Sequence, residues 1–244
     1  MVGAPPPGVP GTGDAVERLV QVVELLRRHC PWTAALDHAS LLTYLVEETY
    51  ELYEAVDEVT RAREPSEEAL AHLCGELGDV LFQVVLHARL QQESGTFGLA
   101  DVAGTLTAKL VRRNPHVFAP DGSLREAFPA SVKEIVDTWQ QVKRAEHPAR
   151  TSVFDGIPHG LPALALAAKT LQRAGEPRVS DLLPAGGSTA DGSTDDEGVL
   201  GRELLDLVRR SLAAGVDPER ALRRAVLIHR DELEGPAEPS STGT

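Results

Sequence analysis

The sequence is poor in basic residues, in aromatic residues and in cysteine. Its 24 Lys and Arg face 37 Asp and Glu, which gives a formal net charge of −13. Because nucleic acids and anionic membrane surfaces bind basic faces, this balance argues against non-specific binding to either of them. A small anionic ligand held by a local basic cluster remains compatible with it.

The two cysteines, Cys30 and Cys74, are too few for a disulfide framework. We therefore expect two small buried thiols in a reducing, cytoplasmic setting. Residues 1–13 lack the basic and apolar regions of a signal peptide, and no apolar run approaches the length of a membrane span. These absences predict a protein without a membrane partner.

Hydrophobic residues make up 42% of the 244 residues, an ordinary share that allows a sizeable core. No segment alternates apolar and polar residues as a strand does, so we expect an all-α fold. Asp14, Ser40 and Ser66 are suited to cap the first three helices. The helices are expected at about residues 14–29, 40–63, 66–93, 99–113, 131–146, 199–214 and 218–233.

Composition divides the chain. Prolines and glycines crowd the first residues, and the stretch after residue 175 is rich in Gly, Ser, Asp and Pro. We expect a disordered tail at 1–13, a main domain at 14–175, a flexible linker at 176–198, a short helical segment at 199–234 and a second disordered tail at 235–244.

The stretch "YLVEETYELYEAVDE", residues 44–58, holds six acids within a helical pattern. Like charges three or four residues apart weaken a helix, so these acids need a compensating role. On a helical wheel, Leu41, Leu45, Leu52 and Ala55 fall within about 60° of Glu48. Glu48 therefore lies in the middle of the apolar stripe, and Glu51 lies at its edge.

The next helix repeats this arrangement, because Glu76 is in line with apolar residues and Asp79 follows three residues later. Two helices thus present carboxylate pairs to the interior, Glu48 with Glu51 and Glu76 with Asp79. Buried carboxylates require raised pKa values or a compensating cation, and hard oxygen ligands suit Mg²⁺ or Mn²⁺. The alternative is a solvated acidic face, which we favour for the remaining acids of the first stretch, Glu54, Asp57 and Glu58.

A di-iron centre is the other metal site that helical bundles build from carboxylates. It requires Glu-x-x-His pairs. None of the eight histidines has a glutamate three residues before it, which argues against such a centre.

Glu47-Glu48-x-x-Glu51, followed after 24 residues by Glu76-x-x-Asp79, resembles the EExxE…ExxD signature of the MazG nucleoside triphosphate pyrophosphohydrolases. A bare EExxE is a weak signal, since acidic helices are common. The resemblance is specific because further segments agree in order over about residues 15–175. These are "CPW", "YLVEETYEL", "GELGDVLFQVVLHARL", "KLVRRNPHVF", a Trp followed by "QQVKR", and "DGIPHGLPAL".

The resemblance implies an all-α helical bundle that forms a homodimer or a higher homo-oligomer. It implies hydrolysis of NTPs or dNTPs to the monophosphate and pyrophosphate with Mg²⁺, for which Mn²⁺ can substitute, in a nucleotide house-cleaning role. The matching metal ligands are Glu48, Glu51, Glu76 and Asp79. Glu47 and Glu48 match the catalytic acids, with Glu47 in metal binding or in orienting water.

A basic group lies near the end of the fourth expected helix, where Lys109, Arg112 and Arg113 are spaced i, i+3 and i+4. Cations also favour a helix C-terminus without any ligand, so the sequence leaves both interpretations open. The resemblance implies phosphate contacts for Lys109 and Arg113. It also places Trp139 and Lys143 near the nucleotide, although a Trp at this position also suits a hydrophobic core.

The sequence departs from the family at Thr33 and Leu36, where relatives often have Asp and Gln, so base and sugar preference stays open.

Residues 199–212 can be aligned with residues 76–89, which puts Val199 and Arg202 at the positions of Glu76 and Asp79. We interpret 199–233 as a metal-less remnant of a second repeat, although leucine-rich helices also align by chance.

Two functions from different classes remain. The first is the Mg²⁺-dependent pyrophosphohydrolase. The second is a non-catalytic helical module that binds nucleotides or partners. The intact set of four acids and the basic helix favour the enzyme, since a degenerate binder is expected to lose acids.

Overall fold

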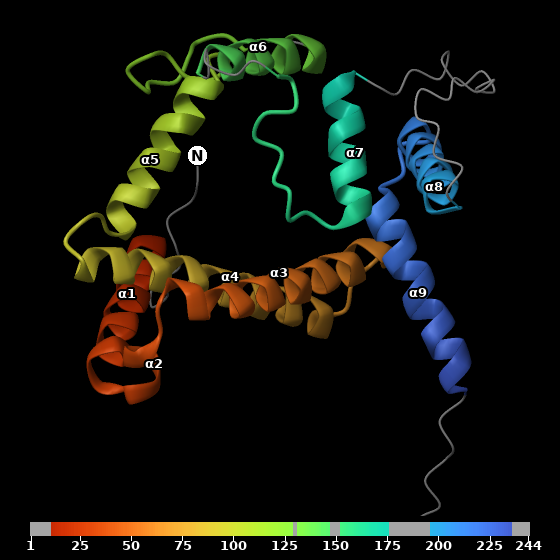
Figure 1. Cartoon of the computed structure of the whole chain (residues 1–244). Coiled ribbons are helices and arrows are strands. Elements are labelled where there is room, and N and C mark those ends of the chain that lie inside the picture. The colour runs from red at the N-terminus through yellow and green to blue at the C-terminus, as the bar shows by residue number, and fades with distance from the viewer. Residues whose placement is uncertain (1–10, 129–130, 147–151, 176–195, 236–244) are drawn as a thin grey trace, which may run out of the picture. The chain divides into compact units, whose positions relative to one another are not determined.

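The computed structural model of the protein describes residues 11–128, 131–146, 152–175 and 196–235. These residues form nine helices and one isolated β-bridge, between Phe118 and Leu124. The all-α prediction is confirmed, and each of the seven expected helices is present (Figure 1). The helices are α1 (Thr12–His29), α2 (Pro31–Ala35), α3 (His38–Arg61), α4 (Glu67–Glu93), α5 (Leu99–Arg113), α6 (Val132–Ala145), α7 (Ala163–Ala174), α8 (Asp196–Ala213) and α9 (Pro218–Glu234).

Two of the three expected helix caps are wrong. α3 is capped by Asp37, whose carboxylate accepts the backbone N–H of Ser40 at 2.7 Å, while the Ser40 hydroxyl accepts the backbone N–H of Asp37 at 2.9 Å. Ser40 is therefore the third residue of a capping box and not the cap. α1 is preceded by Gly11, and Asp14 lies in its first turn. Ser66 caps α4 as predicted.

Two helices were not predicted. α2 has only five residues, too few to show helical periodicity, and it begins at Pro31 where the sequence indicates a break. A proline at the first helical position costs no hydrogen bond, which explains how Pro31 ends one helix and starts another. α7 follows Pro162 and ends at Gly175, whose φ of 81° is the left-handed conformation that glycine adopts most readily.

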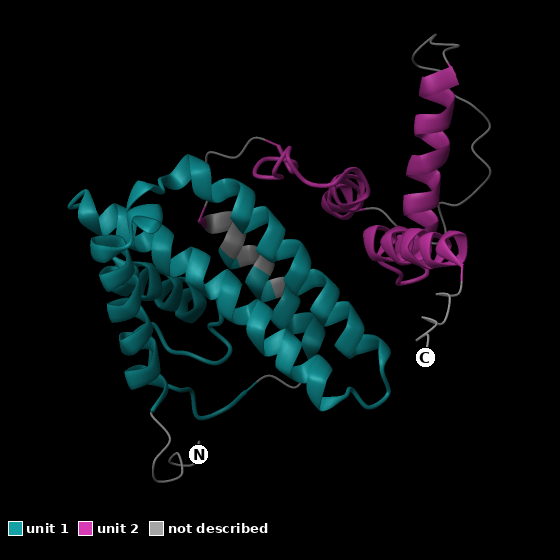
Figure 2. Ribbon diagram, turned by 90° about the horizontal axis from the view of Figure 1, so that it is seen from below, with its two compact units in different colours: residues 1–144 teal, residues 145–244 magenta. Residues whose placement is uncertain are grey.

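Contacts divide the chain into two compact units, residues 1–144 and 145–244 (Figure 2). Unit 1 contains α1 to α5 and all but the last residue of α6, and unit 2 contains α7, α8 and α9, each of which packs against the other two. The predicted tail at 1–13 and the predicted linker at 176–198 are each too long by a few residues, because α1 starts at Thr12 and α8 starts at Asp196. The rest of that linker and most of the two tails lie outside the described residues.

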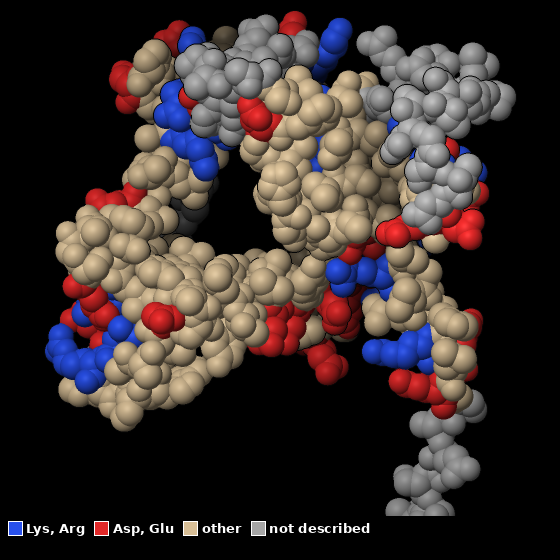
Figure 3. Space-filling model, in the orientation of Figure 1, with Lys and Arg blue, Asp and Glu red and all other residues tan. Residues whose placement is uncertain are grey.

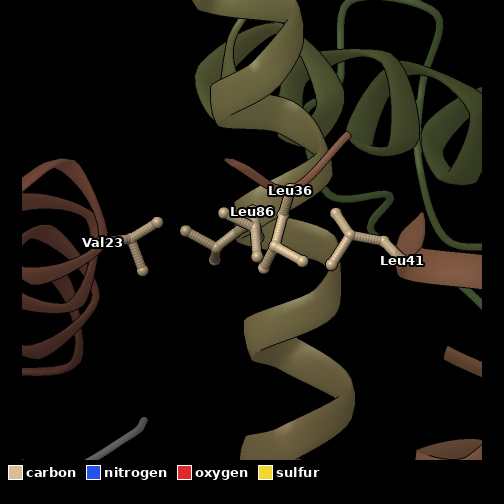
Figure 4. Close-up of a cluster of buried hydrophobic side chains, with 5 residues drawn as sticks. Val23, Leu36, Leu41 and Leu86 are labelled. Carbon is tan, nitrogen blue, oxygen red and sulfur yellow. The ribbon is translucent and has the colours of Figure 1, made fainter. Parts of the chain in front are cut away.

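The core of unit 1 holds together the helices that carry the acids. α3 and α4 pack along each other, and α1 packs on α4. Val23 of α1, Leu36 before α3, Leu41 of α3 and Leu86 of α4 meet in a cluster in which each residue is at most 9% exposed (Figure 4). Burying an aliphatic side chain of this size contributes about 1.5–3 kcal/mol, so this cluster fixes the α3–α4 pair.

Within the described residues, one helix, α4, is long and apolar enough to cross a membrane when length and composition alone are considered. The expectation that no run approaches this length passed over α4, because Glu76 and Asp79 interrupt its apolar residues. α4 packs against α1, α3 and α5, which makes it the central helix of unit 1.

The two cysteines are free thiols. Cys30 is half-buried, whereas Cys74 is exposed, so the expectation of two buried thiols is wrong for Cys74.

Candidate metal centre

Helical periodicity places one acid of each helix on the packed side. Glu48 stands two turns after Leu41 and two turns before Ala55, which are 1% and 0% exposed. Glu76 of α4 likewise stands two turns after Ala69 and two turns before Gln83, which are 5% and 3% exposed. Both acids are half-buried, as their positions on the apolar stripe predict.

The packing of α3 on α4 brings three of the four expected ligands together. Carboxylate oxygens of Glu48, Glu76 and Asp79, one from each residue, all lie within 4.8 Å of one another. Glu51 lies at the edge of the group, close enough for its charge to raise the pKa of Glu48. Figure 3 shows acidic side chains gathered along the α3–α4 pair. We call Glu48, Glu51, Glu76 and Asp79 the acid cluster.

The expectation of four interior carboxylates is correct for only two of them. Glu51 and Asp79 are exposed, whereas Glu48 and Glu76 are half-buried. Two helices that pack as a pair bury one line of residues each. A residue three positions further along, such as Glu51 or Asp79, is rotated by about 60° from that line. It therefore lies at the edge of the contact and is exposed to solvent.

The electrostatics of the acid cluster suit a divalent cation. The pKa of Glu48 is raised, first by burial and then by the neighbouring charges of Asp79, Glu51 and Glu76. Glu76 Oε2 is buried and has no hydrogen-bond partner within the described part of the chain. Crowded carboxylates with an unpaired buried oxygen are unfavourable without a counter-charge, and an all-oxygen donor set fits a hard divalent cation.

His72 contacts the acid cluster and was not singled out from the sequence. Its Nε2 lies 3.2 Å from Glu76 Oε1, and its Nδ1 lies 3.5 Å from Glu58 Oε2. The search for Glu-x-x-His pairs could not find it, because His72 precedes Glu76 by four residues. That spacing puts the two side chains one above the other on α4, and it is the signal that could have found the contact.

The acids outside the cluster behave for the most part as a solvated face. Glu54 and Glu58 are exposed, as expected. Asp57 is less exposed than expected, and Arg61 lies 3.2 Å from its carboxylate in the next turn of α3. Glu47 is exposed and does not belong to the group of carboxylates that meet between α3 and α4.

The basic residues form a second group. The guanidinium carbon of Arg113 on α5 lies 5.8 Å from the centre of the Trp139 ring on α6, a cation–π contact. Lys109 is half-buried and Arg112 is exposed on α5, while the side chain of Lys143 lies outside the described residues. Among the described side chains, no hydrogen bond or ion pair joins this group to the acid cluster.

The two positions that depart from the family pattern have structural roles. Thr33 is 3% exposed, and its hydroxyl donates to the backbone oxygen of Leu26 at 2.7 Å. Leu36 is 9% exposed and belongs to the core cluster. Both residues therefore fasten α2 to α1 and α3.

Comparison with known proteins is consistent with this geometry. The family model described as "MazG nucleotide pyrophosphohydrolase domain" matches residues 36–118, which include the whole acid cluster. The Thermotoga maritima protein named nucleoside triphosphate pyrophosphohydrolase/pyrophosphatase MazG is 34% identical over 229 residues, covering 87% of this chain and 82% of that protein. The chain belongs to the MazG family of nucleoside triphosphate pyrophosphohydrolases. The resemblance carried by the acidic signature is thereby confirmed.

Other MazG relatives differ in length. An uncharacterized 26.1 kDa protein of Streptomyces cacaoi is 41% identical over 231 residues, covering 92% of this chain and 85% of that protein. The nucleoside triphosphate pyrophosphohydrolase of Escherichia coli strain K12 is 39% identical over 165 residues, covering 66% of this chain but only 57% of the enzyme. This MazG chain therefore spans just over half the length of the E. coli relative.

Proposed function

We propose that the chain hydrolyses nucleoside triphosphates, ribo or deoxy, to the monophosphate and pyrophosphate by attack of water at the α-phosphate, and that it removes excess or damaged nucleotides. The observation that carries the proposal is the meeting of Glu48, Glu76 and Asp79 within 4.8 Å between α3 and α4. The names of the E. coli and T. maritima relatives support the reaction class.

Glu48, Glu51, Glu76 and Asp79 would hold Mg²⁺, for which Mn²⁺ can substitute. The raised pKa of Glu48 and the unpaired Glu76 Oε2 support a cation at this place. When bound, the ion would lower the pKa of a coordinated water and neutralise charge on the phosphates. Glu47, next to Glu48 in the chain, is proposed to orient the attacking water.

Lys109, Arg112 and Arg113 are proposed to bind the phosphates and to stabilise the departing pyrophosphate. The family model extends to residue 118 and so includes all three. Trp139 and Lys143 are proposed to lie near the nucleoside. The contact of Arg113 with the Trp139 ring supports a shared site for these two residues.

The assembly is proposed to be a homodimer or a higher homo-oligomer. Large apolar side chains on the helices that carry the acids are exposed in the single chain, among them Leu42 (57%), Val46 (54%) and Leu77 (53%). Exposed apolar surface of this kind is typical of protein interfaces. A second copy would cover part of it and would shield the exposed members of the acid cluster from solvent.

The test is a product assay on the full chain. The protein is incubated with each of the eight common NTPs and dNTPs and Mg²⁺, and the nucleotide products are separated. We expect monophosphate and pyrophosphate in equal amounts, and no product in the presence of a chelator. The ranking of the eight substrates would show the base and sugar preference.

Two other outcomes would contradict the proposal in different ways. Diphosphate and phosphate as products would place the cleaved bond elsewhere in the phosphate chain. Nucleotide binding without turnover of any substrate would favour the non-catalytic binding module.

A further inference from the structure

We propose that His72 is a positioning residue that orients Glu76 toward the cation. The inference rests on the proposed metal-dependent function and deepens it. Its basis is the chain of contacts Glu58–His72–Glu76, in which one imidazole ring meets a carboxylate from each of the two helices of the site.

The first step is the contact within α4. His72 and Glu76 are one turn apart, and Nε2 lies 3.2 Å from Oε1. The two atoms are within ion-pair distance, and because an ionised carboxylate can only accept, the contact is favourable when Nε2 carries a proton. The Glu76 side chain is only 14% exposed, which leaves it few water molecules to compete with the imidazole.

The second step is the consequence for the other oxygen of Glu76. Because Oε1 faces His72, Oε2 is the oxygen left to face a ligand. Oε2 is buried and has no hydrogen-bond partner within the described residues. A carboxylate fixed by one oxygen and unpaired at the other is pre-oriented for a metal, in the way that outer residues orient the ligands of metal sites.

The third step is the orientation of the ring itself. Nδ1 of His72 faces Glu58 Oε2 of α3 at 3.5 Å, so the imidazole spans from α4 to α3. The side chains of His72 and Glu58 are 51% and 50% exposed, and solvent weakens a contact of this kind. The contact with the less exposed Glu76 is therefore the one on which the positioning depends.

The test measures binding of Mn²⁺ alone to the full chain, from the electron paramagnetic resonance signal of the free ion, without nucleotide. We expect His72→Leu to weaken Mn²⁺ binding about tenfold, the low end of the range for residues that orient metal ligands. His72→Gln keeps an N–H near the position of Nε2 and should restore most of the affinity. His72→Asn is shorter and should not.

The chain offers a matched control. His229 on α9 has the same kind of exposed contact, with Nδ1 3.6 Å from Glu232 Oε2. His229→Leu should leave Mn²⁺ binding unchanged. Helix content from circular dichroism is compared for all variants, and the Gln and Asn variants keep the comparison valid if Leu disturbs the fold.

The outcomes separate this inference from the function on which it rests. If the wild-type protein binds no Mn²⁺, the proposed metal site fails, and the role of His72 fails with it. If the wild type binds Mn²⁺ and the Leu, Gln and Asn variants bind it equally well, only the role of His72 is overturned. Weak binding by Leu and Asn with recovery by Gln would support the positioning role.

Discussion

The acidic side chains of two helix pairs, α3–α4 in unit 1 and α8–α9 in unit 2, differ in their ion-pair partners. In the second pair, acids meet arginines of their own helix: Arg209 lies 2.6 Å from Asp206, and Arg223 lies 2.8 Å from Glu219. In the first pair, no Lys or Arg within the described residues forms an ion pair with any member of the acid cluster, whereas His72 lies within ion-pair distance of Glu76.

This is the difference expected between a solvated acidic surface and the proposed cation site. Acidic residues that serve only solubility can pair with a basic residue one turn away on the same helix, as they do in α8 and α9. The same arrangement occurs within α3, where Asp57 pairs with Arg61. Among the described residues, the lack of basic partners is therefore a property of the acid cluster and not of the helix, and it is the arrangement that the proposed cation site requires.

The largest expected effect comes from removing one acid of the α3–α4 pair. Glu48→Gln keeps the size of the side chain and removes a charge from the cluster. We expect it to reduce turnover of the best nucleotide by more than about 100-fold, since a metal ligand should matter more than the residues that orient it. Initial rates at saturating Mg²⁺ measure this loss.

The matched substitution is Asp206→Asn on α8, whose carboxylate is paired with Arg209 and 60% exposed. It should leave turnover unchanged. Equal loss in both variants would show that the acids act through stability or overall charge, and the contrast between the two pairs would have no functional meaning.

An intermediate effect is expected on thermal stability. If Mg²⁺ binds the folded acid cluster as proposed, it should raise the melting temperature of the wild type, with a stabilisation of about 2.7 kcal/mol at a concentration 100 times the dissociation constant. Glu48→Gln should lose most of this response. Without metal, the same variant should be at least as stable as the wild type, because repulsion from Asp79, Glu51 and Glu76 is relieved.

Differential scanning calorimetry with and without Mg²⁺ measures both parts of this prediction. Asp206→Asn again serves as the control and should respond to Mg²⁺ as the wild type does. If Mg²⁺ does not stabilise the wild type, the negative charge of the acid cluster is balanced by something other than Mg²⁺.

The smallest expected effect is a pH dependence in the α3–α4 pair. His87 of α4 stacks on His38 of α3 with their Nδ1 atoms 2.7 Å apart, and its pKa is lowered from the ordinary 6.5 by burial and then by His38. Above pH 6.5 both folded and unfolded states are neutral at this residue, so its stability contribution is fully present. As the pH falls below that value, the unfolded state takes up the proton first, and stability is lost.

Urea unfolding of the wild type and His87→Gln at several pH values between 7.5 and 5.5 would test this sign. The loss of stability on acidification should be smaller in the variant. As a control, His159→Gln at an exposed position should leave the pH dependence of the unfolding free energy as it is in the wild type. A steeper loss of stability in His87→Gln would contradict the lowered pKa of His87 as the cause of the pH dependence.

Much of the fold follows from the sequence because helices are local. Apolar spacing, a serine cap and the Asn114-Pro115 end placed α4 and α5 at nearly their observed bounds. The helix α2 was not predicted because five residues are too few to show a helical period. α7 could have been found from Pro162 and Gly175 at its ends, which are the ordinary start and stop signals of a helix.

The sequence by itself determined that Glu48 and Glu76 lie on the packed faces of two helices, because a period of 3.6 residues fixes the face of every side chain. Only the tertiary structure decided which carboxylates converge. The meeting of Glu48 with Glu76 and Asp79, the exposure of Glu51 and the reach of His72 from α4 to Glu58 depend on how α3 lies against α4. Residues distant in the chain set that packing, and no local pattern contains it.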